Sequence, residues 1–155
     1  MSENTALPKI EGFFASGTTR DDVLNEMAGY LAAKGAVKET YGAAVIEREN
    51  TYPTGIPSEP IGVAIPHSER RDLVLDTTIL VAKLAQDVRF QRIDDADLQV
   101  GVRVIFMLAV DSNQGQLETI STVMELVQDE KLIQKIVEAT SPEEIRQAVS
   151  AAYCG

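Results

Sequence analysis

Apolar residues recur at helical spacing in the first and last thirds of the chain. A helix is predicted between residues 18 and 35, because a threonine followed three residues later by an aspartate approximates a capping box and the closing glycine ends helices. A second helix is predicted over residues 38–49. Near the C-terminus the same spacing predicts helices over residues 116–127 and 131–137. Serine, proline and two glutamates predict a further helix that starts at Ser141.

Shorter apolar runs lie between these helices and predict strands. Residues 50–60 contain three prolines and a glycine and are expected to form a loop. Strands follow over residues 61–65 and 77–84, and residues 88–90 are expected to form a short edge strand. Residues 102–110 are almost entirely apolar, which is typical of a central strand covered on both faces. Helices before and after a set of strands predict an α/β fold of three layers, α/β/α.

The composition fits one globular domain. The 155 residues suit a single domain with a full core, 45% of them are hydrophobic, and no internal repeat or long linker interrupts them. The 14 basic and 24 acidic residues give a net charge of −10. This charge disfavours nucleic acid as a direct partner, because nucleic acid phosphates are also negative. A basic protein partner would be attracted instead.

The N-terminus and the cysteine content predict a cytoplasmic protein. Residues 1–6 lack the basic and apolar regions of a signal peptide. The most apolar stretch, residues 102–110, is too short to cross a membrane, so no direct membrane insertion is expected. The single cysteine, Cys154, precludes an internal disulfide and fits a reducing compartment.

The single histidine, His67, directly follows an apolar run and a proline. Proline disfavours the helical region for the residue before it and ends regular strand pairing. The run therefore predicts a buried strand that stops abruptly, with His67 at its carboxyl end, where ligands and active groups gather in open α/β sheets. Because the unperturbed pKa of histidine lies near neutrality, His67 is the candidate nucleophile or proton-transfer group. The ordinary alternative is a packed or surface histidine.

Two segments before His67 could assist a phosphoryl group on it. Phosphoryl transfer depends mostly on positioning and on positive charge or donors near the phosphoryl oxygens. Arg48, which lies between Glu47 and Glu49, offers a fork of donors suited to phosphate, although an arginine between two glutamates is more often a surface ion pair. Thr54 offers a hydroxyl in the following loop, which on its own is also an ordinary turn.

Other chemistries fit the composition less well. A metal site needs several histidine, cysteine or carboxylate ligands, so no metal is expected. Composition alone leaves a Ser-His-Asp triad open, but the chain has no Gly-x-Ser-x-Gly turn, and it has no Gly-rich Walker loop for a nucleotide. Phosphate chemistry would therefore take its phosphoryl group from another protein, and no cofactor is expected.

Two segments together form a specific combination. Residues 46–56 read Ile-Glu-Arg-Glu-Asn-Thr-Tyr-Pro-Thr-Gly-Ile, and residues 62–67 read Gly-Val-Ala-Ile-Pro-His. The combination resembles the active-site signature of IIA components of the bacterial phosphoenolpyruvate-dependent sugar phosphotransferase system, of the fructose–mannitol type. The aromatic-Pro-Thr-Gly-Ile sequence is most similar to the galactitol-specific branch. The resemblance extends from the first predicted helix to the last.

The resemblance implies a single IIA type-2 domain over residues 1–155, with a mixed sheet between helices. It implies a cytoplasmic phosphotransferase that accepts a phosphoryl group from the carrier protein HPr and passes it to a cysteine of a IIB component. The membrane component IIC would take part indirectly, for uptake of a polyol such as galactitol. By the match, His67 would be the phosphorylated residue, Arg48 the arginine near it and Thr54 a loop residue near the site.

Gln116 marks a departure from many fructose- and mannitol-type members, which resemble this chain but have a second active-site histidine at this place. An amide can donate a hydrogen bond to a phosphoryl oxygen but carries no positive charge. The galactitol branch is glutamine-like here, so Gln116 is a candidate phosphate contact or a plain helix-start residue. Cys154 is interpreted as incidental, because a phosphoryl-accepting cysteine needs a following loop of backbone donors and only Gly155 follows.

Two other functions stay open beside the transport carrier. A regulatory IIA-like module of the nitrogen-related type would use its phosphorylation state as a signal to a partner protein instead of feeding transport. A degenerate relative of the same fold would carry out no phosphotransfer. The presence of both His67 and Arg48 argues against the degenerate relative.

Overall fold

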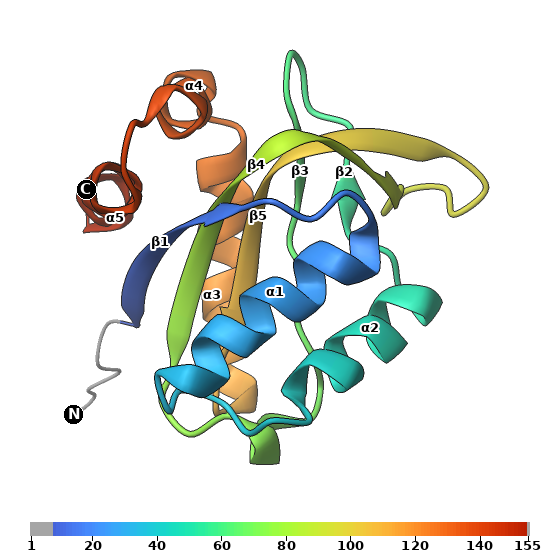
Figure 1. Cartoon of the computed structure of the whole chain (residues 1–155), viewed down its shortest axis with the longest axis vertical. Helices are drawn as coiled ribbons and strands as arrows, with labels where there is room; N and C mark the ends of the chain where they lie inside the picture. The colour runs from blue at the N-terminus through green and yellow to red at the C-terminus, as the bar shows by residue number, and fades with distance from the viewer. Residues whose placement is uncertain (1–7, 155) are drawn as a thin grey trace.

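A five-stranded sheet lies between two layers of helices in the computed structural model, which describes residues 8–154 (Figure 1). The strands lie in the order β1-β4-β5-β3-β2. Both parallel and antiparallel neighbours occur, so the sheet is mixed and the predicted three-layer fold is confirmed. The strand bounds are β1 Lys9–Ala15, β2 Gly55–Ile56, β3 Gly62–Ala64, β4 Thr78–Gln91 and β5 Gln99–Ala109.

Over residues 8–154, two helices cover one face of the sheet and three cover the other (Figure 1). The sequence predicts each of them. The Thr19 hydroxyl accepts a hydrogen bond from the Asp22 amide at 3.1 Å, as the capping signal indicates. The first face carries α1 (Arg20–Ala33) and α2 (Tyr41–Thr51), and the second carries α3 (Asn113–Val127), α4 (Glu130–Glu138) and α5 (Pro142–Cys154).

The sheet separates two hydrophobic cores. Along β4, Leu80 and Ala82 pack on the α1–α2 side, whereas Ile79 and Val81 pack on the α3–α5 side, because successive side chains of a strand point to opposite faces. The strand β5 lies between β4 and β3 and is buried on both faces over most of its length. The central strand predicted at residues 102–110 is therefore confirmed.

One strand was missed by the sequence prediction, and two predicted details are wrong. The sequence does not predict β1, whose short run mixes charged, glycine and apolar positions and whose partner β4 is distant along the chain. Residues 88–90 are not an edge strand, because they continue β4 beyond a register shift and pair with β5. The expected loop at residues 50–60 contains the end of α2 and the short strand β2.

The parallel pair β3 and β5 determines where the candidate residues meet. The carboxyl ends of two parallel strands lie at the same edge of a sheet, and His67 follows β3 while α3 follows β5. The loop with His67 and the first turn of α3 are thus brought to one edge.

The ends of the chain bear on the membrane and cysteine predictions. No helix within residues 8–154 is long and apolar enough to span a membrane. Residues 1–7, on which the prediction about a signal peptide falls, lie outside the described residues, and so does the side chain of Cys154.

Candidate functional site

His67 is held against the central strand of the sheet. It follows β3 after Pro66 and forms an isolated parallel bridge with Leu108 of β5. The Leu108 amide donates a hydrogen bond to the Pro66 carbonyl at 3.1 Å, and the Leu108 carbonyl accepts one from the Tyr41 hydroxyl at 3.0 Å. His67 retains only 6% exposure. The structure thus places the histidine at the carboxyl end of a buried strand, as the sequence predicts.

One ring nitrogen of His67 forms a hydrogen bond with the main chain. Its Nδ1 atom lies 2.8 Å from the Ile65 carbonyl oxygen. A carbonyl oxygen can only accept, so Nδ1 carries the proton and donates it. In the neutral imidazole the other nitrogen, Nε2, then has its lone pair available for attack on an electrophile.

The surroundings favour the neutral form of this imidazole. Burial lowers the pKa of His67 below its ordinary value, and the nearby positive charge of Arg48 lowers that pKa further. The hydrogen bond to the Ile65 carbonyl and the negative charge of Glu69 act in the opposite direction but do not prevail. At neutral pH His67 is therefore uncharged, which is the form that a nucleophile requires.

Arg48 lies in the last turn of α2 and turns its guanidinium toward the loop with His67. Its Nε atom donates to a Glu69 carboxylate oxygen at 3.0 Å, and Nη1 donates to the Tyr52 carbonyl at 3.4 Å. The guanidinium carbon also lies 5.1 Å from the centroid of the Tyr52 ring. Within residues 8–154 no hydrogen bond joins Arg48 to His67 directly, so Arg48 acts on the imidazole through its charge.

Thr54 is buried, and its polar groups point inward. Its amide and its hydroxyl both donate to the Glu49 carboxylate, at 2.8 and 2.9 Å. The hydroxyl oxygen accepts the Ile65 amide at 3.3 Å. Thr54 therefore holds the main chain at Ile65, the residue whose carbonyl is bound by His67.

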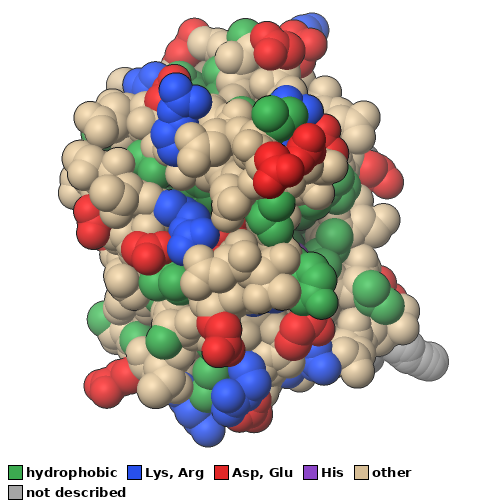
Figure 2. Space-filling model, turned by 90° about the vertical axis from the view of Figure 1, so that its right-hand side faces the viewer, with side chains coloured by type: hydrophobic (Ala, Val, Ile, Leu, Met, Phe, Trp, Pro, Cys, Tyr) green, Lys and Arg blue, Asp and Glu red, His purple; other side chains and the backbone are tan. Residues whose placement is uncertain are grey.

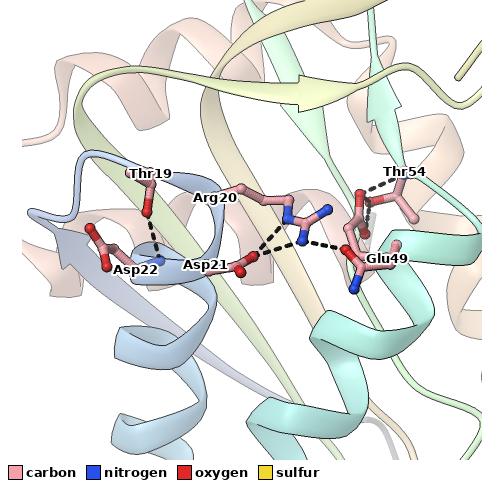
Figure 3. A network of polar contacts seen from close by, with 7 residues as sticks. Thr19, Arg20, Asp21, Asp22, Glu49 and Thr54 are labelled. Carbon is pink, nitrogen blue, oxygen red and sulfur yellow. Dashed lines mark hydrogen bonds and ion pairs between the residues drawn. The ribbon is translucent and has the colours of Figure 1, made fainter. Parts of the chain in front are cut away.

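Glu49, which precedes the turn and is next to Arg48 in the sequence, accepts hydrogen bonds from both polar groups of Thr54 and was not predicted as a site residue. It is 2% exposed. Burial raises the pKa of Glu49, while the bonds from Thr54 and the charges of Arg20 and Arg48 lower it in part. Figure 3 shows Arg20 reaching from the start of α1 toward α2 beside Glu49, where it donates to Asn50. The signal in the sequence was a carboxylate beside a candidate arginine and just before a turn.

Gln116 lies in the first turn of α3 and is 5% exposed. Its amide oxygen is buried and has no hydrogen-bond partner within the described part of the chain. A buried polar atom without a partner is costly and uncommon in native proteins. Within residues 8–154 no hydrogen bond joins Gln116 to His67, so the role of Gln116 as a phosphate contact stays a prediction.

Two exposed apolar side chains lie close in sequence to Arg48 and Gln116: Tyr52 directly follows α2, and Leu117 lies in α3. Tyr52 is 62% exposed and Leu117 is 66% exposed. Figure 2 shows the side of the molecule that lies on the right of Figure 1, with charges of both signs interspersed and no histidine side chain visible. Among the described residues no group of three or more metal-ligating side chains occurs. The arrangement offers a neutral, oriented imidazole beside a guanidinium.

The chain is similar to known proteins of one family. Residues 12–152 match the family model described as "Phosphoenolpyruvate-dependent sugar phosphotransferase system, EIIA 2". The galactitol-specific EIIA component of Escherichia coli strain K12 is 32% identical over 124 residues, which cover 80% of this chain and 80% of that protein. The nitrogen regulatory protein of Klebsiella oxytoca is 28% identical over 131 residues, which cover 82% of this chain and 76% of that protein.

The fold agrees as well. The solved complex of enzyme IIAMTL with phosphorylated enzyme IIBMTL from Escherichia coli contains a chain that matches with a TM-score of 0.71 and 22% identity, over 90% of this chain and 94% of that chain. The family model spans nearly all of the described residues. The chain belongs to the EIIA 2 family of the phosphoenolpyruvate-dependent sugar phosphotransferase system, whose members are phosphotransferases.

Proposed function

We propose that this protein is a phosphocarrier that holds a phosphoryl group on Nε2 of His67. The observation that carries the proposal is the Nδ1–H bond to the Ile65 carbonyl, 2.8 Å long, on the single histidine of the chain. That bond selects one tautomer and leaves one nucleophilic nitrogen. Arg48 supports the proposal because its positive charge lies close enough to influence the imidazole.

The transfer step needs no proton movement at His67. The Nε2 lone pair forms a bond to phosphorus while the phosphorus–nitrogen bond of the donor breaks, and the donor keeps that electron pair. The phosphorylated ring keeps its Nδ1 proton and becomes positively charged. The Ile65 carbonyl, 2.8 Å from Nδ1, then accepts a charge-assisted hydrogen bond, which is stronger than a neutral one. In the onward step the Nε2–phosphorus bond breaks and a sulfur–phosphorus bond forms on the acceptor.

Arg48 and Gln116 are proposed to contact the phosphoryl oxygens. A guanidinium provides charge and paired donors for them, and phosphoryl transfer is accelerated mostly by such electrostatic stabilisation. Gln116 can donate through its amide nitrogen but adds no charge. Thr54 is proposed to act indirectly, by holding Ile65 through its hydroxyl.

The proposed donor is phosphorylated HPr, and the proposed acceptor is a cysteine of a IIB component, with the membrane component IIC involved indirectly. The match to a IIA protein solved in complex with phosphorylated IIB supports the acceptor. The proposed substrate of the whole system is a polyol such as galactitol, supported by the galactitol-specific relative. We infer one EIIA type-2 domain over residues 1–155, acting in the cytoplasm without a cofactor.

A regulatory function is the second candidate, because a nitrogen regulatory protein is among the relatives. In that case the phosphorylation state of His67 would signal to a partner protein. Neighbouring genes distinguish the two candidates. Genes for IIB and IIC components beside this one support transport, and their absence supports signalling.

Phosphorylation itself is tested with labelled phosphoenolpyruvate, enzyme I and HPr. We expect an acid-labile label on the wild-type protein and none on His67→Ala, because no second histidine is present to accept it. The variant His67→Gln keeps a side chain of similar size and should also be unlabelled. If it unfolds in urea like the wild type, the missing label is not caused by loss of the fold. An unlabelled wild type, or an equally labelled His67→Ala variant, would contradict the proposal.

A further inference from the structure

Glu69 forms an ion pair with the Arg48 guanidinium, the group that is proposed to contact the phosphoryl oxygens. Its carboxylate lies 3.0 Å from Nε of Arg48, and the other oxygen lies 3.7 Å from Nη1 of Arg71. The Glu69 side chain is 62% exposed, whereas that of Arg48 is 22% exposed. Within residues 8–154 this is the one ion pair of Arg48. Glu69 lies in the loop directly after His67, two residues further along the chain.

We propose that Glu69 is a positioning residue that holds Arg48 while His67 is unphosphorylated and releases it to the phosphoryl oxygens when His67 is phosphorylated. The inference rests on the proposed function, since it requires a phosphoryl group on Nε2. It assigns to Glu69 a role that neither the sequence motif nor the family match provides.

The two states exchange one anion for another on the same donors. A guanidinium presents a planar fork that fits a carboxylate and a phosphoryl group equally well. A phosphoryl group carries about two negative charges, so it attracts Arg48 more strongly than Glu69 does and also repels the Glu69 carboxylate. Arg48 stays in place during the exchange, because Tyr52 contacts it through both its carbonyl and its ring.

Glu69 is free to make the complementary movement. Its carboxylate is mostly exposed, so leaving Arg48 returns it to water at little cost. Arg71 lies close enough to keep a partial partner for it. The buried backbone of His67 and Ile65 need not move, since their hydrogen bonds involve neither arginine.

Because of Glu69, the phosphoryl group on His67 is expected to be stabilised less by Arg48 than it would be if Arg48 had no ion pair. Part of the attraction between Arg48 and the phosphoryl oxygens is offset by the pair that must first break. The phosphoryl group is therefore passed on more readily to the next acceptor. Removal of the Glu69 charge is expected to stabilise phosphorylated His67.

The test compares Glu69→Gln with Glu47→Gln, which removes the same charge from an exposed carboxylate next to Arg48 in sequence. Each protein is equilibrated with labelled phospho-HPr, and the ratio of phosphorylated to free protein is measured. We expect Glu69→Gln to raise the equilibrium constant roughly two- to five-fold, the range for exposed ion pairs. We expect Glu47→Gln to match the wild type. The difference should shrink at high salt, which screens exposed charges.

A second measurement follows the carboxylate directly. Arg48 holds the pKa of Glu69 below its ordinary value in the unphosphorylated protein, where His67 and Arg71 also face it. Carbon-13 NMR of Glu69 should show that its pKa rises when the wild type is phosphorylated. The reason is that Glu69 loses its ion pair with Arg48 and that the negative phosphoryl group comes close to it.

The outcomes separate the two proposals. A labelled wild type whose equilibrium is unchanged by Glu69→Gln, or whose Glu69 pKa stays constant, overturns the role of Glu69 and leaves the phosphocarrier intact. An unlabelled wild type overturns the phosphocarrier and, with it, the role of Glu69.

Discussion

At the scale of single residues, Thr54 links a buried carboxylate to the residue that orients the histidine. Its hydroxyl donates to Glu49 and accepts from the Ile65 amide, so one small side chain satisfies two buried polar groups. Substitution by an isostere without the hydroxyl removes the hydrogen bond to the buried Ile65 amide, and it leaves the Glu49 carboxylate with the Thr54 amide but without the hydroxyl. The position therefore tests whether the site depends on this link.

We expect Thr54→Val to lower the free energy of unfolding by about 1–3 kcal/mol, the usual cost of an unsatisfied buried partner. Thr54→Ser keeps the hydroxyl and should lose less than about 1 kcal/mol for the missing methyl group. Urea denaturation measures both. Nitrogen-15 NMR of His67 should show the Nδ1–H tautomer depleted in Thr54→Val and retained in Thr54→Ser. Equal tautomer populations in the two variants would show that Thr54 only stabilises the fold.

The protonation of His67 gives a second prediction at this scale. Burial is the main cause that lowers the pKa of His67. The positively charged imidazole of the folded protein therefore loses its second ring proton at a pH below the ordinary pKa of 6.5. Between the lowered pKa and 6.5 the unfolded chain binds more protons than the folded one. This contribution to stability therefore grows as pH rises through that window and is lost as pH falls through it.

Proton NMR can follow this titration without assignment problems, because the chain has a single histidine. We expect the midpoint below 6.5 in the wild type, and a higher midpoint in Arg48→Gln, because that variant removes a positive charge that lowers the pKa. Lys34→Gln, an exposed change away from the site, controls for the loss of one positive charge. A wild-type midpoint at or above 6.5 would contradict a buried, neutral nucleophile.

At the scale of elements, the position of His67 depends on how closely β3 approaches β5. A Cβ atom added at Gly62 would lie 2.2 Å from the Gly101 carbonyl oxygen and 2.8 Å from a methyl group of Val100. The pairing of β3 with β5 shifts register directly after Gly62. Only glycine allows this approach. Gly62 is the first of the three residues of β3, and the loop with His67 follows that strand.

We expect Gly62→Ala to lower the free energy of unfolding by about 1–3 kcal/mol, as overpacking of a tight contact does, and to reduce labelling of His67 because β3 is displaced. Gly29→Ala is the matched control, since a Cβ atom there meets nothing within 4 Å on the exposed side of α1. It should stabilise the helix by up to about 1 kcal/mol. Urea denaturation and the labelling assay check both variants, and unaltered stability in Gly62→Ala would refute the close approach.

The elements also show where prediction from sequence ends. Helices with clear caps and periodic apolar residues were predictable, and so was the apolar strand β5. The strand β1 was not, since its alternation is broken at Gly12 and its pairing with β4 is set by tertiary contacts. Residues 88–90 were predicted to form a separate edge strand, whereas they continue β4 beyond a register shift in its pairing with β5.

At the scale of the whole molecule, the site joins the two helical layers through the sheet. Tyr41 of α2 donates to the Leu108 carbonyl, and the Leu108 amide donates to Pro66, next to His67. The side chain of Leu108 packs in the core under α3–α5. The local motif predicted His67, Arg48 and Thr54 as candidates, but contacts such as these come from segments far apart in sequence and no local pattern contains them.

The acceptor that orients His67 is a main-chain carbonyl, and this has a consequence for variation. A change of side chain at Ile65 alters packing but leaves the carbonyl in place. A substitution at Ile65 can therefore change the tautomer of His67, the proposed nucleophile, only if it displaces the backbone. The proposed roles of the side chains at positions 48, 69 and 116 have no such protection, because each would act through its own functional group. We expect natural diversification of this protein to tune the strength of phosphoryl binding at those three positions while the choice of nucleophilic nitrogen stays constant.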